Sequence, residues 1–177
     1  MKKILLLISI VFVLIPAASA GGSTYGGIVY SVLEDDANIE ISAVGGRVGA
    51  FLNENFSVEG RVQIGVGDDE GYDSQSAIAY SVEANTLIGI YSRIGFYISP
   101  YVYPYGIIGY SQLDYTVESR GGASSISVDD KESSASFGFG VDVSVSKTTL
   151  LNIEYLRLID ESEFEVDALS IGATFRF

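Results

Sequence analysis

Residues 166–177 read VDALSIGATFRF, and apolar side chains fall on every second position up to the final phenylalanine. Because successive side chains of a β-strand point to opposite faces, this spacing predicts one extended strand. Leu169, Ile171, Ala173, Phe175 and Phe177 share one face, and Ala168, Ser170, Gly172, Thr174 and Arg176 share the other. We therefore expect a last strand with one apolar face and one small or polar face.

The first twenty residues have the three parts of a secretory signal peptide. Two lysines precede an apolar run from Ile4 to Ile15, and Pro16 and the small-residue site Ala18-Ser19-Ala20 follow it. The run is shorter than the ~20 residues that a membrane-spanning helix needs. We predict that residues 1–20 are cleaved after Ala20, which leaves residues 21–177 as a single exported domain.

The residue types that the chain lacks exclude several classes of chemistry. It contains no histidine and no cysteine, and its net charge is −13. Histidine-dependent triads, histidine-based zinc sites and thiol chemistry are therefore excluded. We expect no catalytic residue, no cofactor and no metal site, and the negative charge argues against nucleic acid as a partner.

Seven further segments repeat the alternation of residues 166–177. The clearest are Phe56 to Gly67 and Phe137 to Ser146, in which charges occur on one face only. A strand tilted by ~40° needs about ten residues to cross an apolar band of ~25 Å, and every segment reaches that length. The predicted strands lie at residues 23–33, 39–52, 56–67, 77–91, 100–115, 134–146, 150–159 and 166–177.

The predicted connections differ in length and polarity. Those at 53–55 and 147–149 are tight, whereas those at 68–76, 116–133 and 160–165 are long or polar, and 34–38 is short but acidic. This asymmetry is typical of barrels in an outer membrane, with both termini on the periplasmic side. Lipid offers no partner for an open sheet edge, so the first strand must pair with the last. The sequence thus predicts an all-β, eight-stranded, antiparallel, up-and-down transmembrane β-barrel.

The face opposite the apolar one holds glycine, serine, alanine and isolated charges of both signs. Enclosed charges must be paired, and the interior of an eight-stranded barrel is just wide enough for side chains to fill it. We therefore predict a lumen charge network. Its predicted members are Arg47, Glu59, Arg61, Glu83, Asp142, Glu154 and Arg176. The alternative is that these charges lie on the solvated surface of a soluble β-sandwich.

Aromatic residues cluster around the fourth and fifth predicted strands. A tyrosine ring prefers the acyl boundary of a membrane while its hydroxyl reaches water. We predict a periplasmic aromatic girdle of Tyr91, Phe96, Tyr97, Tyr101, Tyr103 and Tyr105. The alternative is that these rings fill a protein core.

Acidic residues concentrate in the four longer connections. They are Glu34, Asp35 and Asp36; Asp68, Asp69, Glu70 and Asp73; Asp129, Asp130 and Glu132; and Asp160, Glu161, Glu163, Glu165 and Asp167. We expect solvated loops that keep the surface soluble. The functional alternative is a surface that attracts divalent cations or basic proteins.

Several elements, in this order and spacing, resemble the outer-membrane β-barrel domain family, the small porin-like barrels of the OmpA and OmpX type. They are residues 45–62, Pro104-Tyr105 with Gly106 and Gly109, Phe137 to Asp142, Ile153-Glu154-Tyr155 and Phe175-Arg176-Phe177. The resemblance implies the outer membrane of a Gram-negative bacterium, contact with membrane lipid and lipopolysaccharide, and a monomer. It also implies that Leu169, Ile171, Ala173, Phe175 and Phe177 form a C-terminal insertion signal for the barrel-assembly machinery.

Three functions remain open at this stage, because one fold serves many purposes. The first is a non-enzymatic protein with a filled polar lumen, serving envelope structure, surface interaction or adhesion. The second is a small diffusion porin, whose inward charges would line water. The third is a soluble periplasmic β-barrel binding module, which would bury Val62, Val141 and Ile171 against protein.

Overall fold

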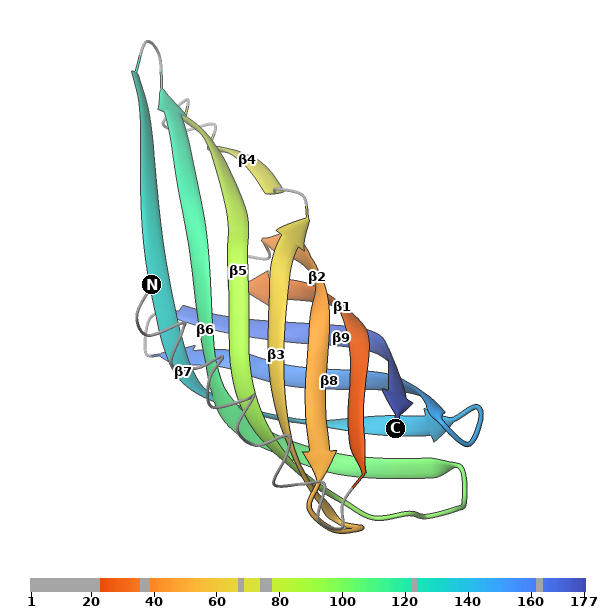
Figure 1. Ribbon diagram of the computed structural model, residues 1–177. Helices are drawn as coiled ribbons and strands as arrows, with labels where there is room; N and C mark the ends of the chain where they lie inside the picture. The colour runs from red at the N-terminus through yellow and green to blue at the C-terminus, as the bar shows by residue number, and fades with distance from the viewer. Residues whose placement is uncertain (1–22, 36–38, 67–68, 74–77, 122–123, 162–163) are drawn as a thin grey trace.

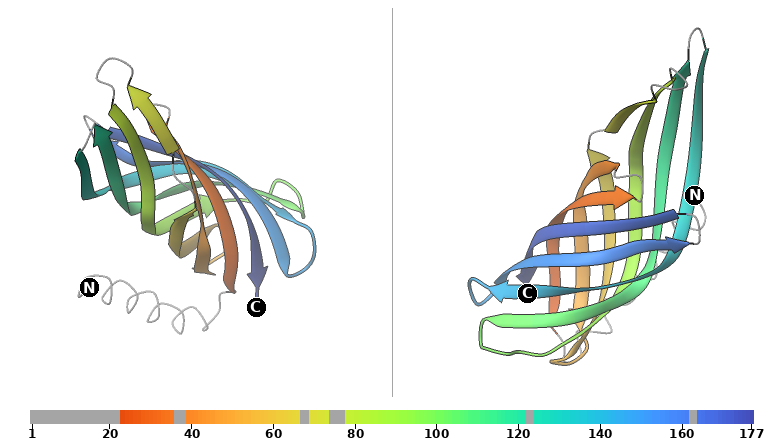
Figure 2. Two further views of the ribbon diagram at one scale, coloured as in Figure 1. Left: turned by 90° about the horizontal axis from the view of Figure 1, so that it is seen from above. Right: turned by 180° about the vertical axis from the view of Figure 1, so that it is seen from behind.

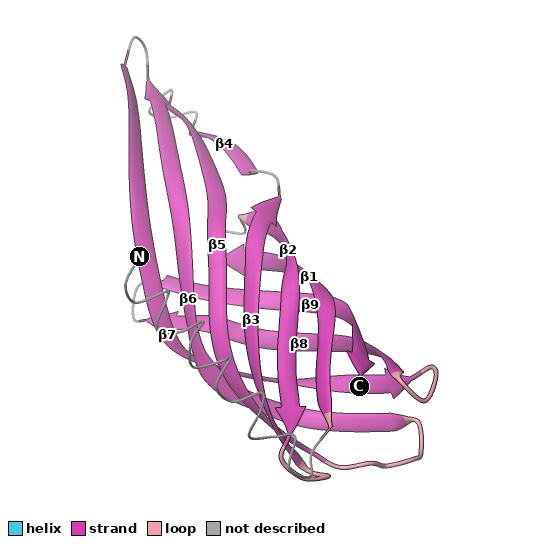
Figure 3. Ribbon diagram, viewed as in Figure 1, coloured by secondary structure: helices cyan, strands magenta, loops and turns pink. Residues whose placement is uncertain are grey.

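Figure 1 shows a computed structural model that describes residues 23–35, 39–66, 69–73, 78–121, 124–161 and 164–177. Strands and their connections make up all of these ranges (Figure 3). The strands are β1 (Thr24–Asp35), β2 (Glu40–Phe51), β3 (Phe56–Val66), β4 (Asp69–Asp73), β5 (Ile78–Gly95), β6 (Val102–Gly121), β7 (Ser124–Ser144), β8 (Thr149–Glu161) and β9 (Phe164–Arg176). A helix long and apolar enough to cross a membrane is not found in the described part of the chain.

The strands form one closed antiparallel wall. Their order is β3-β2-β1-β9-β8-β7-β6-β5-β4, and a further pairing between β3 and β5 joins the two ends (Figure 2). β3 and β4 lie one after the other along the same edge of β5, because β3 pairs with residues 86–94 and β4 with residues 78–82. The wall therefore has eight strand positions, and the prediction of an eight-stranded up-and-down barrel is confirmed.

The first and last strands close the barrel, as the sequence predicts. β1 pairs with β9 from Tyr25 opposite Arg176 to Asp35 opposite Val166. The short connections 52–55, 96–101 and 145–148 lie together with the two ends of the described chain. We call this the turn end of the barrel, and the opposite end the hairpin end. Asn53 stabilises one short turn, since its Oδ1 accepts the backbone N–H groups of Asn55 and Phe56 at 2.9 Å.

The prediction of a long loop at residues 116–133 is wrong. β6 and β7 contain 20 and 21 residues and stay paired to Gly121 opposite Ser124, so their hairpin rises beyond the rest of the wall (Figure 1). Lys131 Nζ lies 2.7 Å from Asp114 Oδ2 across the pair. A strand that extends beyond the membrane meets water on both sides and does not need one apolar face. Residues 116–133 therefore lack the alternating pattern of a strand, although their backbones stay paired in the β6–β7 ladder.

The outer face of the wall is apolar. Its exposed side chains include Ile28, Val44, Ile64, Ile108, Phe139, Ile153 and Leu169. Val62 is 48% exposed and Ile171 57% exposed, whereas a soluble binding module would bury both against protein. All of these side chains alternate with inward-facing ones along their strands, so the wall separates an apolar outside from the interior.

Candidate functional site in the barrel interior

Alternation along the strands determines which side chains reach the interior. On β3 the buried positions are Ser57, Glu59, Arg61 and Gln63, and their neighbours Val62 and Ile64 are exposed. The same parity turns Arg47 on β2, Arg93 on β5, Asp142 on β7 and Glu154 on β8 into the barrel. Six charged side chains from five strands therefore meet in one small volume.

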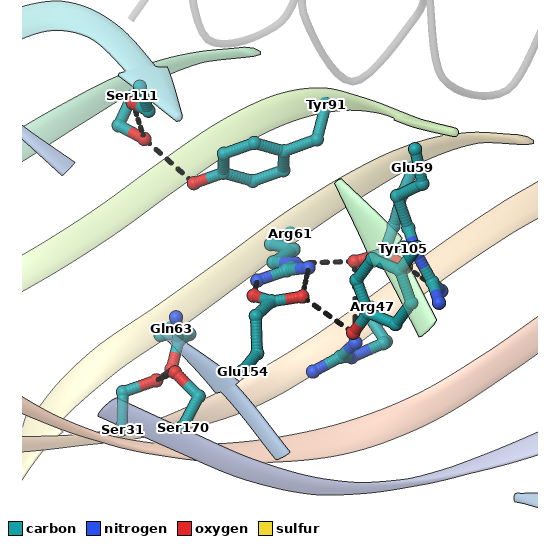
Figure 4. A network of polar contacts seen from close by, with 12 residues as sticks. Ser31, Arg47, Glu59, Arg61, Gln63, Tyr91, Tyr105, Ser111, Glu154 and Ser170 are labelled. Carbon is teal, nitrogen blue, oxygen red and sulfur yellow. Dashed lines mark hydrogen bonds and ion pairs between the residues drawn. The ribbon is translucent and has the colours of Figure 1, made fainter. Parts of the chain in front are cut away.

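These six residues form what we call the ionic layer, with three arginines and three carboxylates. Arg61 contacts both Glu59 and Glu154, with Nη2 donating to Glu154 Oε2 at 2.9 Å (Figure 4). Arg93 contacts Asp142 and also lies 3.4 Å from Glu59 Oε2. Arg47 Nη1 lies 3.6 Å from Glu59 Oε1. Glu59 therefore joins all three arginines, and the charges of the layer balance.

Tyrosines complete the ionic layer. The hydroxyl of Tyr25 donates to Glu59 at 2.8 Å, and the hydroxyl of Tyr105 donates to Glu154 at 2.9 Å. The guanidinium of Arg93 lies 3.7 Å from the centre of the Tyr105 ring, and that of Arg61 lies 4.6 Å from the centre of the Tyr91 ring. Stacking of this kind suits a guanidinium that has left water, because the ring face carries partial negative charge.

Glycine makes room for these rings. A Cβ atom at Gly140 would lie 2.5 Å from the Tyr105 hydroxyl oxygen, and one at Gly89 would lie 2.2 Å from that of Tyr91. Neither separation is possible between real atoms. The inward glycines predicted from the narrow barrel thus give the tyrosine rings the space in which they reach the carboxylates.

A layer of short polar side chains lies next to the ionic layer, toward the hairpin end. Ser31 Oγ donates to Gln63 Oε1 at 2.9 Å and lies 2.7 Å from Ser170 Oγ (Figure 4). Ser136 Oγ donates to Ser111 Oγ at 2.7 Å, which in turn lies 2.7 Å from the Tyr91 hydroxyl. We call these five Ser and Gln residues the hydroxyl layer. Their hydrogen bonds satisfy polar groups that the wall removes from water.

Beyond the hydroxyl layer the interior changes character. The buried side chains there are apolar, and we call them the apolar layer: Leu33, Ala43, Ala84, Leu87, Leu113, Leu156, Leu158, Ile159, Val166 and Ala168. A cavity of about 250 Å³ lies over this layer at the hairpin end. The interior therefore has a charged part near the turn end and an apolar part at the hairpin end.

The comparisons with known proteins agree with this geometry. A family model described as "Outer membrane protein beta-barrel domain" matches residues 4–177, which is nearly the whole chain. The chain belongs to this outer-membrane β-barrel family. It is an outer-membrane protein, and its exposed apolar belt is the surface that contacts lipid.

Three solved structures illustrate how far the likeness extends. A major outer membrane protein from Thermus thermophilus has a TM-score of 0.60 at 10% identity, covering 89% of this chain and 100% of that one. The N-terminal β-barrel domain of Pseudomonas aeruginosa OprF has 0.59 at 16%, covering 88% and 99%. Ail, the attachment invasion locus protein of Yersinia pestis, has 0.55 at 17%, covering 88% and 97%. No curated protein sequence matches the chain. At such identities the likeness concerns the fold alone.

Two predicted members of the lumen charge network, Glu83 and Arg176, lie outside the ionic layer. Glu83 is exposed, because a bulge between Ala84 and Thr86 inserts Asn85 and reverses the alternation of β5. Ala84 then faces inward and Glu83 outward. Arg176 faces the interior at the turn end, where it donates to the Tyr97 hydroxyl at 2.8 Å and stacks on Phe51. The other five predicted members lie together in the ionic layer.

The predicted periplasmic girdle is wrong for three of its six tyrosines and phenylalanines. Tyr91, Tyr103 and Tyr105 are 1%, 1% and 4% exposed and point into the barrel. Phe96, Tyr97 and Tyr101 are exposed near the turn end, where the prediction places them. These six rings are neighbours along the chain, but strand parity decides which side of the wall each ring occupies.

Arg93 is the member of the ionic layer that the sequence analysis missed. The predicted strand ended at residue 91, but β5 continues to Gly95. Two signals could have found it. Arg93 lies two positions after Tyr91 and so shares its face, and the predicted network held four acids but only three arginines, which is one positive charge too few for an enclosed set.

Several buried side-chain polar atoms make no hydrogen bond, and those of Arg47 and Asn152 lie near one another. All three guanidinium nitrogens of Arg47, and both side-chain polar atoms of Asn152, are buried and make no hydrogen bond. The side chains of Arg47 and Asn152 both approach Gly172, since a Cβ there would lie 3.2 Å from Arg47 Nη2 and 2.4 Å from Asn152 Oδ1. Buried groups of this kind are positions for internal water. Among the described residues, no cluster of three or more acidic side chains could hold a metal ion.

Proposed function

We propose that this protein is a non-enzymatic structural and surface-interaction barrel, with a filled interior and an acidic surface outside the cell. The observation that carries the proposal is the β6–β7 hairpin. In the described residues β8 pairs with β7 only from Phe137 to Ser144, so residues 124–136 have β6 as their ladder partner. A strand edge with unpaired N–H and C=O groups is a template for adding a further strand.

The charge of this hairpin supports a basic partner. Residues 114–132 contain five acidic and two basic residues, and Lys131 is paired with Asp114. Ail was crystallised with the heparin analogue sucrose octasulfate, which is a polyanion. For this chain the opposite preference is proposed: a basic protein segment that adds to the β7 edge, with divalent cations as weaker competitors for the same carboxylates.

Shortening the hairpin tests the proposal. Replacing residues 118–127 with Asn-Gly keeps the Val117–Val128 pair and closes it with a favoured two-residue turn. Cells that display the wild type should attach to surfaces coated with basic protein, and cells that display the shortened form should attach no better than cells without the barrel. A heat-modifiable band on a gel would show that the shortened barrel is folded. Equal attachment of both forms contradicts the interaction function.

The ionic layer supports the proposal that the barrel does not conduct ions. Its charges pair across the interior from five strands, and arginine side chains occupy the centre. In planar bilayers the wild type should give no steady channels. The buried atoms of Arg47 and Asn152 that make no hydrogen bond favour the second candidate, a small diffusion porin, because water at these groups would be the start of a pathway. Steady channels that widen in Arg61→Ser would establish the porin and exclude the filled barrel.

The remaining expectations belong to the same proposal. They are cleavage after Ala20, insertion by the barrel-assembly machinery through Leu169 to Phe177, contact with lipopolysaccharide, and a monomeric state. The exposure of Ile171, Phe175 and Phe177 on the lipid face supports the insertion signal. The absence of histidine and cysteine supports the non-enzymatic assignment. N-terminal sequencing of the mature protein tests the cleavage site directly.

A further inference from the structure

The cavity at the hairpin end is lined by apolar side chains that converge from different strands. Leu33 on β1, Ile41 on β2, Leu113 and Tyr115 on β6 and Val166 on β9 all face it. Its volume of about 250 Å³ is just below the ~300–1,000 Å³ of sites for drug-sized ligands. The mouth of a barrel meets water, and an apolar lining there is unfavourable unless something covers it. The size fits one small apolar group.

The mouth of this cavity is acidic. Asp35 lines it, with its Oδ1 accepting the backbone N–H of Ile39 at 2.9 Å. Asp130 pairs directly with Tyr115 and Glu132 with Leu113 in the β6–β7 ladder. Directly opposed residues share a face of the sheet, so both carboxylates stand on the same side as the cavity lining. Both also act electrostatically on the Tyr115 hydroxyl.

Among the described residues that line the cavity, none is basic. Lys131 lies between the two acids in sequence, but it points to the opposite face, where it pairs with Asp114. Arg157 likewise pairs with Glu165 and Asp167 on the outer side of the wall. The site therefore combines an apolar pocket, an aromatic ring at its mouth and three nearby carboxylates, and the described lining residues include no basic side chain.

We propose that this cavity binds a small organic cation with an apolar body, of the arylalkylammonium class. The apolar part enters between Leu33, Ile41, Leu113 and Val166, and the ammonium group remains at the mouth. There it faces the Tyr115 ring and the carboxylates of Asp35, Asp130 and Glu132. Aromatic faces and carboxylates are the two kinds of group that recognise ammonium ligands in proteins. This inference shares Asp130 and Glu132 with the proposed surface interaction, but it does not depend on the β7 edge.

Three probes with the same phenethyl body separate the contributions to binding. The barrel, in lipid nanodiscs with methyl-labelled Ile, Leu and Val, is titrated with phenethylammonium, 2-phenylethanol and 3-phenylpropanoate. Phenethylammonium should shift the methyl resonances of Ile41, Leu113 and Val166. The neutral alcohol should bind several-fold more weakly, and the anion should cause no shift at the same concentration. Equal binding of cation and anion, or shifts confined to the lipid-facing methyls of Ile64 and Ile171, would overturn the proposal.

Two variants and one control locate the site. Ala84 lines the cavity, and Ala84→Leu fills part of it without changing strand pairing, so phenethylammonium binding should be lost. Asp130→Asn with Glu132→Gln should weaken the cation by about three-fold or more, as expected for partly exposed ion pairs, and leave the alcohol unchanged. Glu34→Gln, at the same end of the barrel but facing outward, is the matched control and should bind as the wild type does.

The outcomes remain decisive if one variant does not fold. The double carboxylate variant changes exposed and half-exposed side chains and keeps the barrel intact, as its heat-modifiable band will show. If it binds phenethylammonium as tightly as the wild type does, the acidic mouth has no role and the proposal fails. If Ala84→Leu folds and still binds, the cavity is not the site. Loss of attachment in the shortened hairpin with retained cation binding would separate the two functions.

Discussion

The ionic layer and the apolar layer fill the same barrel in different ways. Both are enclosed by the same eight-position wall, and both consist of inward side chains from several strands. A shift of one residue in the pairing register of a strand moves each of its side chains to the opposite face of the wall. For β3 or β8 such a shift would expose the charge of Arg61 or Glu154 to lipid, at a high cost in free energy. The same shift would expose Leu87 or Leu156 to lipid at little cost in free energy, because leucine is apolar. The ionic layer therefore specifies register, and the apolar layer contributes packing.

Breaking the ionic layer should have the largest effect. Arg61→Met keeps much of the side-chain volume but leaves Glu154 without its bidentate partner and Glu59 without one of three. Removing one member of a buried pair costs about 3–5 kcal/mol, because a buried charge remains unpaired. Urea unfolding of the barrel refolded into lipid vesicles would measure this loss.

The matched control is Arg157→Met. Arg157 bonds Asp167 at 3.0 Å on the outer side of the wall, where both side chains are partly exposed. A pair of that kind contributes little to the free energy of unfolding, because water competes for both charges. Combining Arg61→Met with Glu154→Leu should recover part of the stability that the single change loses. Equal losses at Arg61 and Arg157 would contradict the distinction between interior and surface pairs.

Breaking the apolar layer should have the next largest effect. Leu156 is 1% exposed and lies directly after Glu154 among the inward positions of β8. Leu156→Ala removes packing and leaves a cavity, which costs about 2–4 kcal/mol. The same unfolding experiment measures it, with the lipid-facing Ile153→Ala as control. If Leu156→Ala costs less than Ile153→Ala, the hairpin-end interior is not packed as the apolar layer requires.

The sequence predicts the ionic layer and the apolar layer only as far as the alternation of side chains along each strand continues without interruption. Period-two alternation identifies the barrel, its closure by β1 and β9, and Arg47, Glu59, Arg61, Asp142 and Glu154 as inward charges. The period-two pattern fails where a bulge intervenes, as at Asn85, because a bulge depends on pairing with another strand. A bulge at Leu158 has the same effect on β8 and places both Leu158 and Ile159 inside.

The apolar layer was harder to predict than the ionic layer. Leucine is expected on the lipid face, and nothing local distinguishes an inward Leu113 from an outward Leu169 except the phase of the strand. The cavity over this layer is harder still, since its lining comes from strands distant in sequence. The inward position of Tyr91 and Tyr105 depends on the glycines opposite them, which single-strand patterns do not reveal.

A glycine change tests whether the ionic layer needs its tyrosines in place. In Gly140→Ala the new methyl group would overlap the Tyr105 hydroxyl, so the ring must move and its hydrogen bond to Glu154 is lost. Overpacking of this kind costs about 1–3 kcal/mol. Gly46→Ala is the control, because its Cβ meets only a backbone oxygen at 3.6 Å. Unfolding free energies that fall equally in both variants would show that the Tyr105 contact is not responsible.

The smallest loss of unfolding free energy is expected in the hydroxyl layer, which lies between the ionic layer and the apolar layer. Ser170→Ala removes the partner of Ser31 at 2.7 Å, but Ser31 still donates to Gln63, so no buried donor is left unpaired. The cost should be about 1 kcal/mol or less, the net value of one hydrogen bond. Ser31→Ala removes both bonds, leaves Gln63 Oε1 without that donor, and should cost more. Equal unfolding free energies for the two variants would mean that the hydrogen bonds of the hydroxyl layer act as separate pairs. A larger loss for Ser31→Ala would show that Ser31 is the centre of a hydrogen-bond network between the ionic and apolar layers.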